Sequence, residues 1–130
     1  KGLFGKSSFR STQEYFVRKY FRPQGKQYMV NDDIRSLVSF GQLNLLDDEM
    51  IQLIGSVDLI FCRNVLIYFD KKSRIRTLKT FYNKLNPGGY LLLGHSESLM
   101  NVSTDFELVH LKNDLVYRKP SAAGGKGEFP

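Results

Sequence analysis

The sequence has 130 residues, which is enough for one domain or part of one but not for two independent hydrophobic cores. Apolar residue types make up 42% of the chain and charged types 25%, the balance of a folded globular protein rather than a disordered one. Nineteen Lys and Arg against thirteen Asp and Glu give a net charge of +6, which favours acidic partners.

The residue pattern also argues against membrane, disulfide-rich and metal-cluster proteins. The longest apolar run, residues 57–62, contains Asp58 and is far too short to span a bilayer, so we expect no membrane insertion. The single cysteine, Cys62, rules out an internal disulfide and a multi-cysteine zinc site, and the two histidines lie far apart. We therefore expect no bound metal. Because no cationic start leads into a secretory signal, we expect a cytoplasmic location.

A small hairpin is predicted in the first third of the chain. The capping-box spacing of Ser11 and Glu14 indicates one or two helical turns. Dense aromatic and β-branched residues then predict a strand over residues 15–22. A turn at residues 23–26 and a second short strand at residues 27–30 complete the hairpin.

Less regular segments are expected on both sides of this hairpin. Residues 1–9 are predicted to be a loop, since they mix a few apolar side chains with Gly, Lys and Ser. Residues 31–33 are predicted to be a helix cap or turn, and residues 37–45 a further extended segment.

The middle of the chain has the pattern of a strand, a helix and a second strand. The compact apolar run at residues 57–62 is typical of a strand buried on both faces, as in a parallel sheet. Asp70 is a good helix N-cap, and apolar residues then recur at helical spacing until residues 87–89, Pro-Gly-Gly, stop the helix. Residues 90–93 are predicted to be the next buried strand. These elements form a βαβ unit, so the predicted fold class is α/β.

The last regular elements that the residue pattern predicts form a hairpin. Residues 106–111 and 115–118 are predicted to form two antiparallel strands joined by a short polar turn. Residues 121–130, composed largely of Ala, Gly, Lys and Pro, are predicted to be a flexible tail.

Polar residues follow both strands of the βαβ unit at their carboxyl ends, where ligands bind in open α/β sheets. Cys62-Arg63-Asn64 comes at the end of the first strand, and residues 94–98, GHSES, follow the second. Because parallel strands point the same way, we expect the two clusters to lie near each other at one edge of the sheet.

Each of these residues also has a purely structural interpretation. Arg63 alone is compatible with an ordinary surface arginine, and Asn64 alone with a turn residue. Tyr68 would more commonly be a core aromatic with a satisfied hydroxyl, and a lone histidine such as His95 is more often structural. Cys62 is expected to act as a small buried hydrophobe rather than a nucleophile. The residue pattern by itself therefore indicates half of an α/β ligand-binding domain.

A family resemblance adds to this interpretation. Residues 58–70, DLIFCRNVLIYFD, resemble a signature of the CheR family, the chemoreceptor glutamate methyltransferases. The likeness continues in residues 85–90, LNPGGY, and in residues 92–98, LLGHSES. It reaches upstream to residues 43–46, LNLL, and covers most of the chain from about residue 2 to residue 119.

The resemblance implies the carboxyl-terminal part of a class I, Rossmann-like methyltransferase sheet that uses S-adenosylmethionine and releases S-adenosylhomocysteine. Asn44 and Leu45 match positions that contact the cofactor in the family, and Arg63 and Asn64 match a second cofactor-contacting pair. Tyr68 matches a tyrosine that faces the reacting methyl group, and it is therefore our candidate catalytic residue. The implied product is a glutamate methyl ester on the cytoplasmic helices of a chemoreceptor.

The implied chemistry agrees with the residues present. A glutamate carboxylate has an unperturbed pKa of about 4.3 and is ionised at neutral pH, so the nucleophile needs no general base. The protein must supply alignment for in-line displacement and exclude water from the carboxylate. The absence of a convincing base or metal ligand set is therefore compatible with methyl transfer.

The resemblance also predicts the domain organisation. Residues 1–120 would be the carboxyl-terminal portion of the methyltransferase domain, with a small inserted antiparallel β-subdomain at about residues 15–42. Some family members use that subdomain to grip a receptor peptide. The loop at residues 23–26 is shorter than in those members, which argues against such tethering here.

Parts of the family pattern are not found in these residues. A glycine-rich loop with an acidic residue holds the methionine part of the cofactor in the family, and no such loop occurs here. We therefore expect the isolated chain to be inactive and to bind S-adenosylmethionine weakly or not at all. The sheet would also have an exposed edge, which would allow self-association.

Two other functions remain as alternatives. In one, the chain is a non-catalytic module that docks on a receptor or signalling partner through the small hairpin or a basic face. In the other it binds nucleic acid, an alternative that only the net charge supports. No aromatic–basic recognition motif is present, so we expect no nucleic-acid partner.

Overall fold

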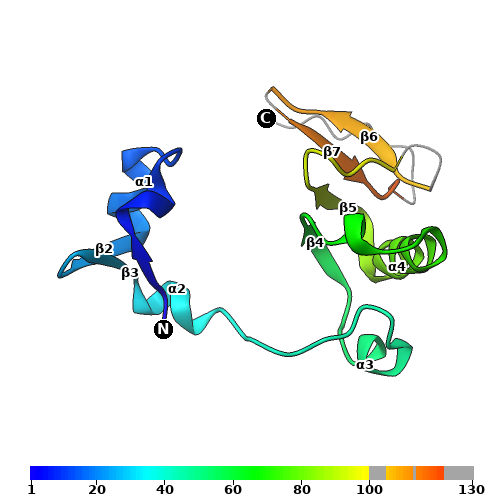
Figure 1. Cartoon of the computed structure of the whole chain (residues 1–130), viewed down its shortest axis with the longest axis horizontal. Coiled ribbons are helices and arrows are strands. Elements are labelled where there is room, and N and C mark those ends of the chain that lie inside the picture. The colour runs from blue at the N-terminus through cyan, green and yellow to red at the C-terminus, as the bar shows by residue number, and fades with distance from the viewer. Residues whose placement is uncertain (100–104, 113, 122–130) are drawn as a thin grey trace. The chain divides into compact units, whose positions relative to one another are not determined.

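The computed structural model describes residues 1–99, 105–112 and 114–121. The chain divides into two compact units, Lys1–Gln42 and Leu43–Pro130. The predicted tail at residues 121–130 lies outside the described residues except for Ser121. Figure 1 shows the strands and helices of each unit.

A three-stranded antiparallel sheet forms the centre of the first unit. Its strands are β1 (Leu3–Gly5), β2 (Phe21–Gln24) and β3 (Gln27–Val30), in the order β1-β3-β2. The pairing of β2 with β3 confirms the predicted hairpin, although its turn is shorter than expected because Pro23 and Gln24 belong to β2. Gly25 begins the turn with φ of 59°, a left-handed value that favours glycine.

The prediction that residues 1–9 form a loop is wrong. Strand β1 pairs with β3 over three residues, and a 3-10 turn, η1 (Lys6–Phe9), follows it. Aromatic side chains pack around this pairing. The ring centroid of Phe9 lies 4.9 Å from that of Phe21 and 5.2 Å from that of Tyr28. The antiparallel sheet therefore begins upstream of residue 15, the approximate start that the family resemblance implied for the small subdomain.

The strand predicted over residues 15–22 is also wrong for most of its length, because helix α1 (Glu14–Tyr20) occupies this segment. The helix brings together residues four apart, such as the Glu14–Arg18 ion pair and the stacked rings of Phe16 and Tyr20. Its N-cap is Gln13 with no side-chain cap bond, so the Ser11 capping box does not form.

The first unit ends with a short helix and an irregular segment. Helix α2 (Asp32–Ser36) follows β3, and Asp32 forms ion pairs with Arg22 and Arg35 at 2.8 and 2.9 Å. The extended segment predicted at residues 37–45 is not a strand, since it has no regular secondary structure. No residue of this unit is fully buried, so its core consists of half-buried side chains.

A four-stranded mixed sheet forms the centre of the second unit. Its strands run in the order β4-β5-β7-β6, and their bounds are Val57–Cys62 for β4, Leu85–Leu93 for β5, Leu115–Arg118 for β7 and Glu107–His110 for β6. Strands β4 and β5 are parallel, which confirms the predicted βαβ unit. Strands β6 and β7 are antiparallel, which confirms the predicted hairpin.

Helix α4 (Lys71–Lys84) connects β4 to β5 and supplies one side of the core (Figure 1). As predicted, Asp70 is its N-cap, and Asp70 Oδ1 accepts a hydrogen bond from Ser73 N at 2.7 Å. The core residues that surround it are almost fully buried: Cys62, Leu66, Leu78, Phe81, Leu85, Leu91 and Leu99. The helix, the sheet and the segments that follow β4 and β5 therefore share one core.

Strand β5 begins earlier than predicted, at Leu85 rather than at residue 90. The register jumps from the pair Val57↔Leu85 to the pair Leu59↔Tyr90, so the residues between form a bulge. Gly88 has φ of 80° there. The helix thus ends before residues 87–89, Pro-Gly-Gly, as predicted. These residues belong to the irregular start of β5 instead of a separate loop.

Strand β4 is less buried than its sequence predicted. Leu59 is 45% exposed and Phe61 is 65% exposed, whereas Cys62 is buried. Among the described strands β4 pairs only with β5 and forms one edge of the sheet, which leaves one of its faces incompletely covered.

A helix that the sequence pattern did not indicate precedes β4. Helix α3 (Asp48–Gln52) is capped by Asp47, whose Oδ1 accepts a hydrogen bond from Met50 N at 3.1 Å, and it buries Ile51. None of the helices in the described ranges has both the length and the apolar character that a membrane span requires.

Candidate functional site

Two loops meet at the carboxyl ends of the parallel strands. The loop after β4 covers residues 63–69 and contains a 3-10 turn, η2 (Leu66–Tyr68). The loop after β5 covers residues 94–98. Hydrogen bonds between Glu97 and residues 64–67 join the loops, which confirms that the two polar clusters lie side by side.

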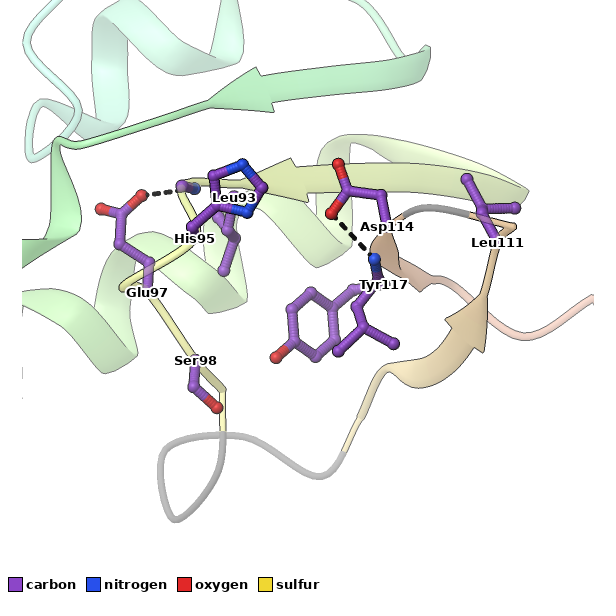
Figure 2. Close-up of a pocket in the computed structure, with 9 residues that line it drawn as sticks. Leu93, His95, Glu97, Ser98, Leu111, Asp114 and Tyr117 are labelled. Atoms are coloured by element: carbon purple, nitrogen blue, oxygen red, sulfur yellow. Dashed lines mark hydrogen bonds between the residues drawn. The ribbon is translucent and has the colours of Figure 1, made fainter.

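The carboxylate of Glu97 accepts hydrogen bonds from five backbone N–H groups. Its Oε2 accepts from Asn64 N and from Gly94 N, both at 2.7 Å, and the dashed line at Glu97 in Figure 2 marks the second of these bonds. Its Oε1 accepts from the N–H groups of the next three residues, Val65 at 3.0 Å, Leu66 at 2.8 Å and Ile67 at 3.3 Å. One side chain therefore satisfies most backbone donors at the start of the first loop.

The backbone around this carboxylate is unusually restricted. Asn64 has φ of 60°, a left-handed value that asparagine tolerates better than most residues. A Cβ atom on Gly94 would lie 2.4 Å from Asn64 Oδ1 and 2.8 Å from Glu97 Oε2. Only glycine therefore fits at position 94 while Asn64 and Glu97 keep their places.

The hydrogen bonds also stabilise the charged form of Glu97. Burial would raise the pKa of this carboxyl group, but the N–H groups of Gly94, Asn64, Leu66 and Ile67 lower the pKa below its ordinary value of 4.5. Glu97 is thus a carboxylate at neutral pH.

The neighbouring thiol is affected in the opposite direction. Burial, and then the negative charge of Glu97, raise the pKa of Cys62 to about 11. Cys62 is only 5% exposed and belongs to the hydrophobic core. Its interpretation as a buried small hydrophobe is confirmed, because a protonated, covered thiol is a poor nucleophile.

Two of the five residues matched to family sites line one groove. The groove lies beside β4, has a volume of about 450 Å³, and is bounded by Leu45 and Arg63 among mostly apolar side chains. Asn44, next to Leu45, is exposed; its Oδ1 accepts a hydrogen bond from Leu46 N at 3.0 Å and so stabilises the turn before α3. Leu45 and Arg63 therefore come together from segments that are far apart in the sequence.

The other two residues, Asn64 and Tyr68, lie on the loop after β4. Tyr68 is 81% exposed, so it is not a core aromatic, and it does not line the groove. It ends the turn η2, whose first residue, Leu66, is buried in the core. Leu66 thereby anchors the turn that carries Tyr68.

A second hollow of about 440 Å³ lies beside the loop after β5 (Figure 2). His95, Glu97, Ser98, Asp114 and Tyr117 line part of it. Figure 2 shows the Asp114 carboxylate accepting a bond, which comes from Leu115 N at 2.8 Å. With two acidic side chains in its lining, this hollow is poorly suited to an anionic ligand.

Sequence reasoning identified the GHSES block but missed the role of Glu97. Its partners are backbone N–H groups, which every residue type except proline carries, so the residue types around it give no sign of the arrangement. The only available signal was a glutamate three residues after a glycine at a strand end. In the described ranges, no group of three or more His, Cys, Asp or Glu side chains is placed to hold a metal ion.

Comparison with known proteins shows that the sequence of this chain is similar to those of methyltransferases. Residues 1–115 match the family described as "CheR methyltransferase, SAM binding domain". The chain is 43% identical over 122 residues to chemotaxis protein methyltransferase 2 of Vibrio cholerae, a match that covers 92% of this chain and 42% of that protein. It is 44% identical over 105 residues to the chemotaxis protein methyltransferase of Klebsiella aerogenes, covering 81% of this chain and 34% of the relative.

A third relative gives the same result. Chemotaxis protein methyltransferase 1 of Pseudomonas aeruginosa is 40% identical over 103 residues, which is 78% of this chain and 37% of the relative. The chain thus spans about two fifths of the length of the curated relatives that it matches.

Proposed function

This chain belongs to the CheR methyltransferase family, as part of its S-adenosylmethionine-binding domain, and from that premise we propose the activity of the protein that contains it. The mixed α/β sheet is the carboxyl-terminal portion of a class I methyltransferase fold. The proposed reaction is transfer of a methyl group from S-adenosylmethionine to glutamate side-chain carboxylates of chemoreceptors. It yields glutamate methyl esters and S-adenosylhomocysteine in chemotaxis signalling.

One observation carries the proposal. Glu97 joins the loops at the carboxyl ends of β4 and β5, and the first of these loops carries Arg63, Asn64 and Tyr68. This is the edge at which open α/β sheets bind their ligands. A module used only for docking has no need for these residues together at that edge.

The proposed cofactor contacts are Asn44, Leu45, Arg63 and Asn64. The groove beside β4 supports the choice of Leu45 and Arg63, because its apolar lining and the guanidinium of Arg63 suit a flat apolar ring with polar edges. When bound, S-adenosylmethionine supplies an electrophilic methyl group on a sulfonium. The chain's own residues bind and orient it, and they exclude water from the groove.

The proposed catalytic residue is Tyr68. Its exposed side chain on an anchored turn leaves the hydroxyl accessible to a substrate. The attacking carboxylate is already ionised at neutral pH and needs no base. Tyr68 would therefore orient the reacting groups by hydrogen bonding rather than move a proton.

The proposed partners are the cytoplasmic helices of methyl-accepting chemoreceptors. The substrate glutamates are acidic, and the net charge of +6 on this chain favours encounter with them. We accordingly propose that the protein works in the cytoplasm, where those helices lie.

Calorimetric titration with S-adenosylhomocysteine tests the cofactor assignment. We expect the 130-residue chain to bind weakly or not at all. A protein extended upstream to include the rest of the methyltransferase domain, called the longer protein below, should bind. Arg63→Ala or Asn64→Ala in the longer protein should reduce affinity by about tenfold or more, since each removes a polar contact. Arg76→Ala, which removes an exposed arginine on α4, should leave the affinity unchanged.

The same experiment separates the proposal from a docking function. The first unit favours docking by one feature, a hollow of about 560 Å³ lined by Phe4, Val38 and Phe40 beside Arg35. A longer protein that is folded, binds no S-adenosylhomocysteine and still binds a receptor would make docking the better explanation.

A further inference from the structure

We propose that Glu97 is a positioning residue for the cofactor: its carboxylate fixes the backbone of the loop after β4, and with it Arg63, Asn64 and Tyr68. This inference rests on the proposed function of these residues. Glu97 itself lies in the loop after β5 and acts through the residues that it holds. Neither the family description nor the relatives' names assign it a role.

The first argument is the number of bonds that depend on one side chain. Five N–H groups, from residue 94 and from residues 64–67, converge on the two oxygens of Glu97 within 3.3 Å. Among the described backbone bonds of loops and turns, none of these five N–H groups donates to a carbonyl oxygen. Only Tyr68 N and Phe69 N, later in the same loop, donate to carbonyl oxygens within the turn. Removing the carboxylate would leave several partly buried donors without an acceptor.

The second argument is the conformation that these bonds maintain. Asn64 occupies a left-handed conformation that is unfavourable for a residue with a Cβ atom. The bond from Asn64 N to Glu97 Oε2 holds it there, at the same oxygen that receives Gly94 N. The backbone conformation at Asn64, directly after Arg63, therefore depends on the position of Glu97.

The third argument is chemical, because the site requires a carboxylate rather than any polar side chain. Each oxygen of Glu97 accepts at least two bonds. A glutamine has the same length but replaces one oxygen with an NH₂ group, which can only donate. Glu97→Gln would thus place a donor against two or three N–H donors. Glu97→Asp keeps the charge but is one methylene too short to reach both loops.

The test uses the longer protein and two measurements, amide hydrogen exchange without cofactor and titration with S-adenosylhomocysteine. We expect Glu97→Gln to accelerate exchange at residues 64–67 and 94 by about tenfold or more relative to the rest of the sheet. The same variant should weaken S-adenosylhomocysteine binding by about tenfold or more. Glu97→Asp should produce smaller changes in the same direction, and it replaces Glu97→Gln should the latter not fold.

Two control variants separate positioning from general instability or loss of charge. Glu49→Gln removes an exposed carboxylate on α3 and should change neither measurement. Gly89→Ala disturbs the opposite end of β5 and should lower stability without a selective effect on residues 64–67 or on affinity.

The outcomes distinguish the inference from the function on which it rests. Normal S-adenosylhomocysteine affinity, or unchanged exchange at residues 64–67, in a folded Glu97 variant would overturn the positioning role alone. An unaltered longer protein that binds no S-adenosylhomocysteine would instead overturn the proposed function, and the positioning of a cofactor with it.

Discussion

At the scale of single residues, Glu97 makes the stability of the fold depend on pH. Its backbone hydrogen bonds lower its pKa in the folded state below the ordinary value of 4.5, despite its partial burial. A lowered folded pKa adds stability that is fully present above the unfolded pKa and is lost as the pH falls through the folded pKa. We therefore expect the free energy of unfolding to decrease below about pH 4.5 because Glu97 takes up a proton on unfolding.

Urea unfolding of the longer protein between neutral pH and pH 3 measures this dependence. Glu97→Gln should be less stable at neutral pH and should show a shallower loss of stability on acidification, since it has no proton to gain. Glu49→Gln should keep the steeper slope of the unaltered protein. Equal slopes for Glu97→Gln and the unaltered protein would contradict the linkage.

Residue identities predicted only part of the candidate site. Arg63 and Asn64 stand out in the sequence because polar residues follow a buried apolar run, and the strand ends there as expected. The role of Glu97 could not be predicted, because its five partners are main-chain donors whose convergence exists only after β4 and β5 pair in parallel. The exposure of Tyr68 likewise depends on how η2 is anchored, which no local pattern encodes.

At the scale of elements, the junction between α4 and β5 depends on a glycine at position 89. A Cβ atom there would lie 2.9 Å from the carbonyl oxygen of Asn86 and 3.0 Å from that of Asp58, both rigid main-chain atoms. Gly89→Ala should therefore destabilise the fold by about 1–3 kcal/mol, as overpacking usually does. Denaturant unfolding checks this, with Gly55→Ala as the matched control because no atom lies within 4 Å of its added methyl group. The same loss in both variants would show that crowding is not the cause.

The elements that sequence predicted well are those with dense core contacts or a clear cap. Strand β4, the Asp70-capped helix α4 and the β6–β7 hairpin fall where the apolar pattern placed them. In residues 1–42 the prediction was poorer, because no residue is fully buried and the periodic apolar signal is weak. There the aromatic residues of α1 suggested a strand, while pairs four residues apart, such as Glu14 and Arg18, favour the helix.

At the scale of the whole molecule, the β4 edge of the sheet in the second unit should cause the isolated 130-residue chain to self-associate. Strand β4 has one described neighbour, β5, and its residues Leu59 and Phe61 are largely exposed. An edge strand with exposed apolar side chains is a template for pairing with another chain. Sedimentation velocity of the isolated chain should therefore show a mass that increases with protein concentration.

Placing a charge on this edge distinguishes strand pairing from general stickiness. Phe61→Lys should keep the chain monomeric, because a lysine on an edge strand opposes pairing with a second copy. Ile75→Lys introduces the same charge at an exposed apolar position of α4 and should leave the association unchanged. Monomers at every concentration, or equal suppression by both substitutions, would refute edge pairing. Concentration-dependent association that only Phe61→Lys abolishes would identify β4 as the surface on which the chain pairs.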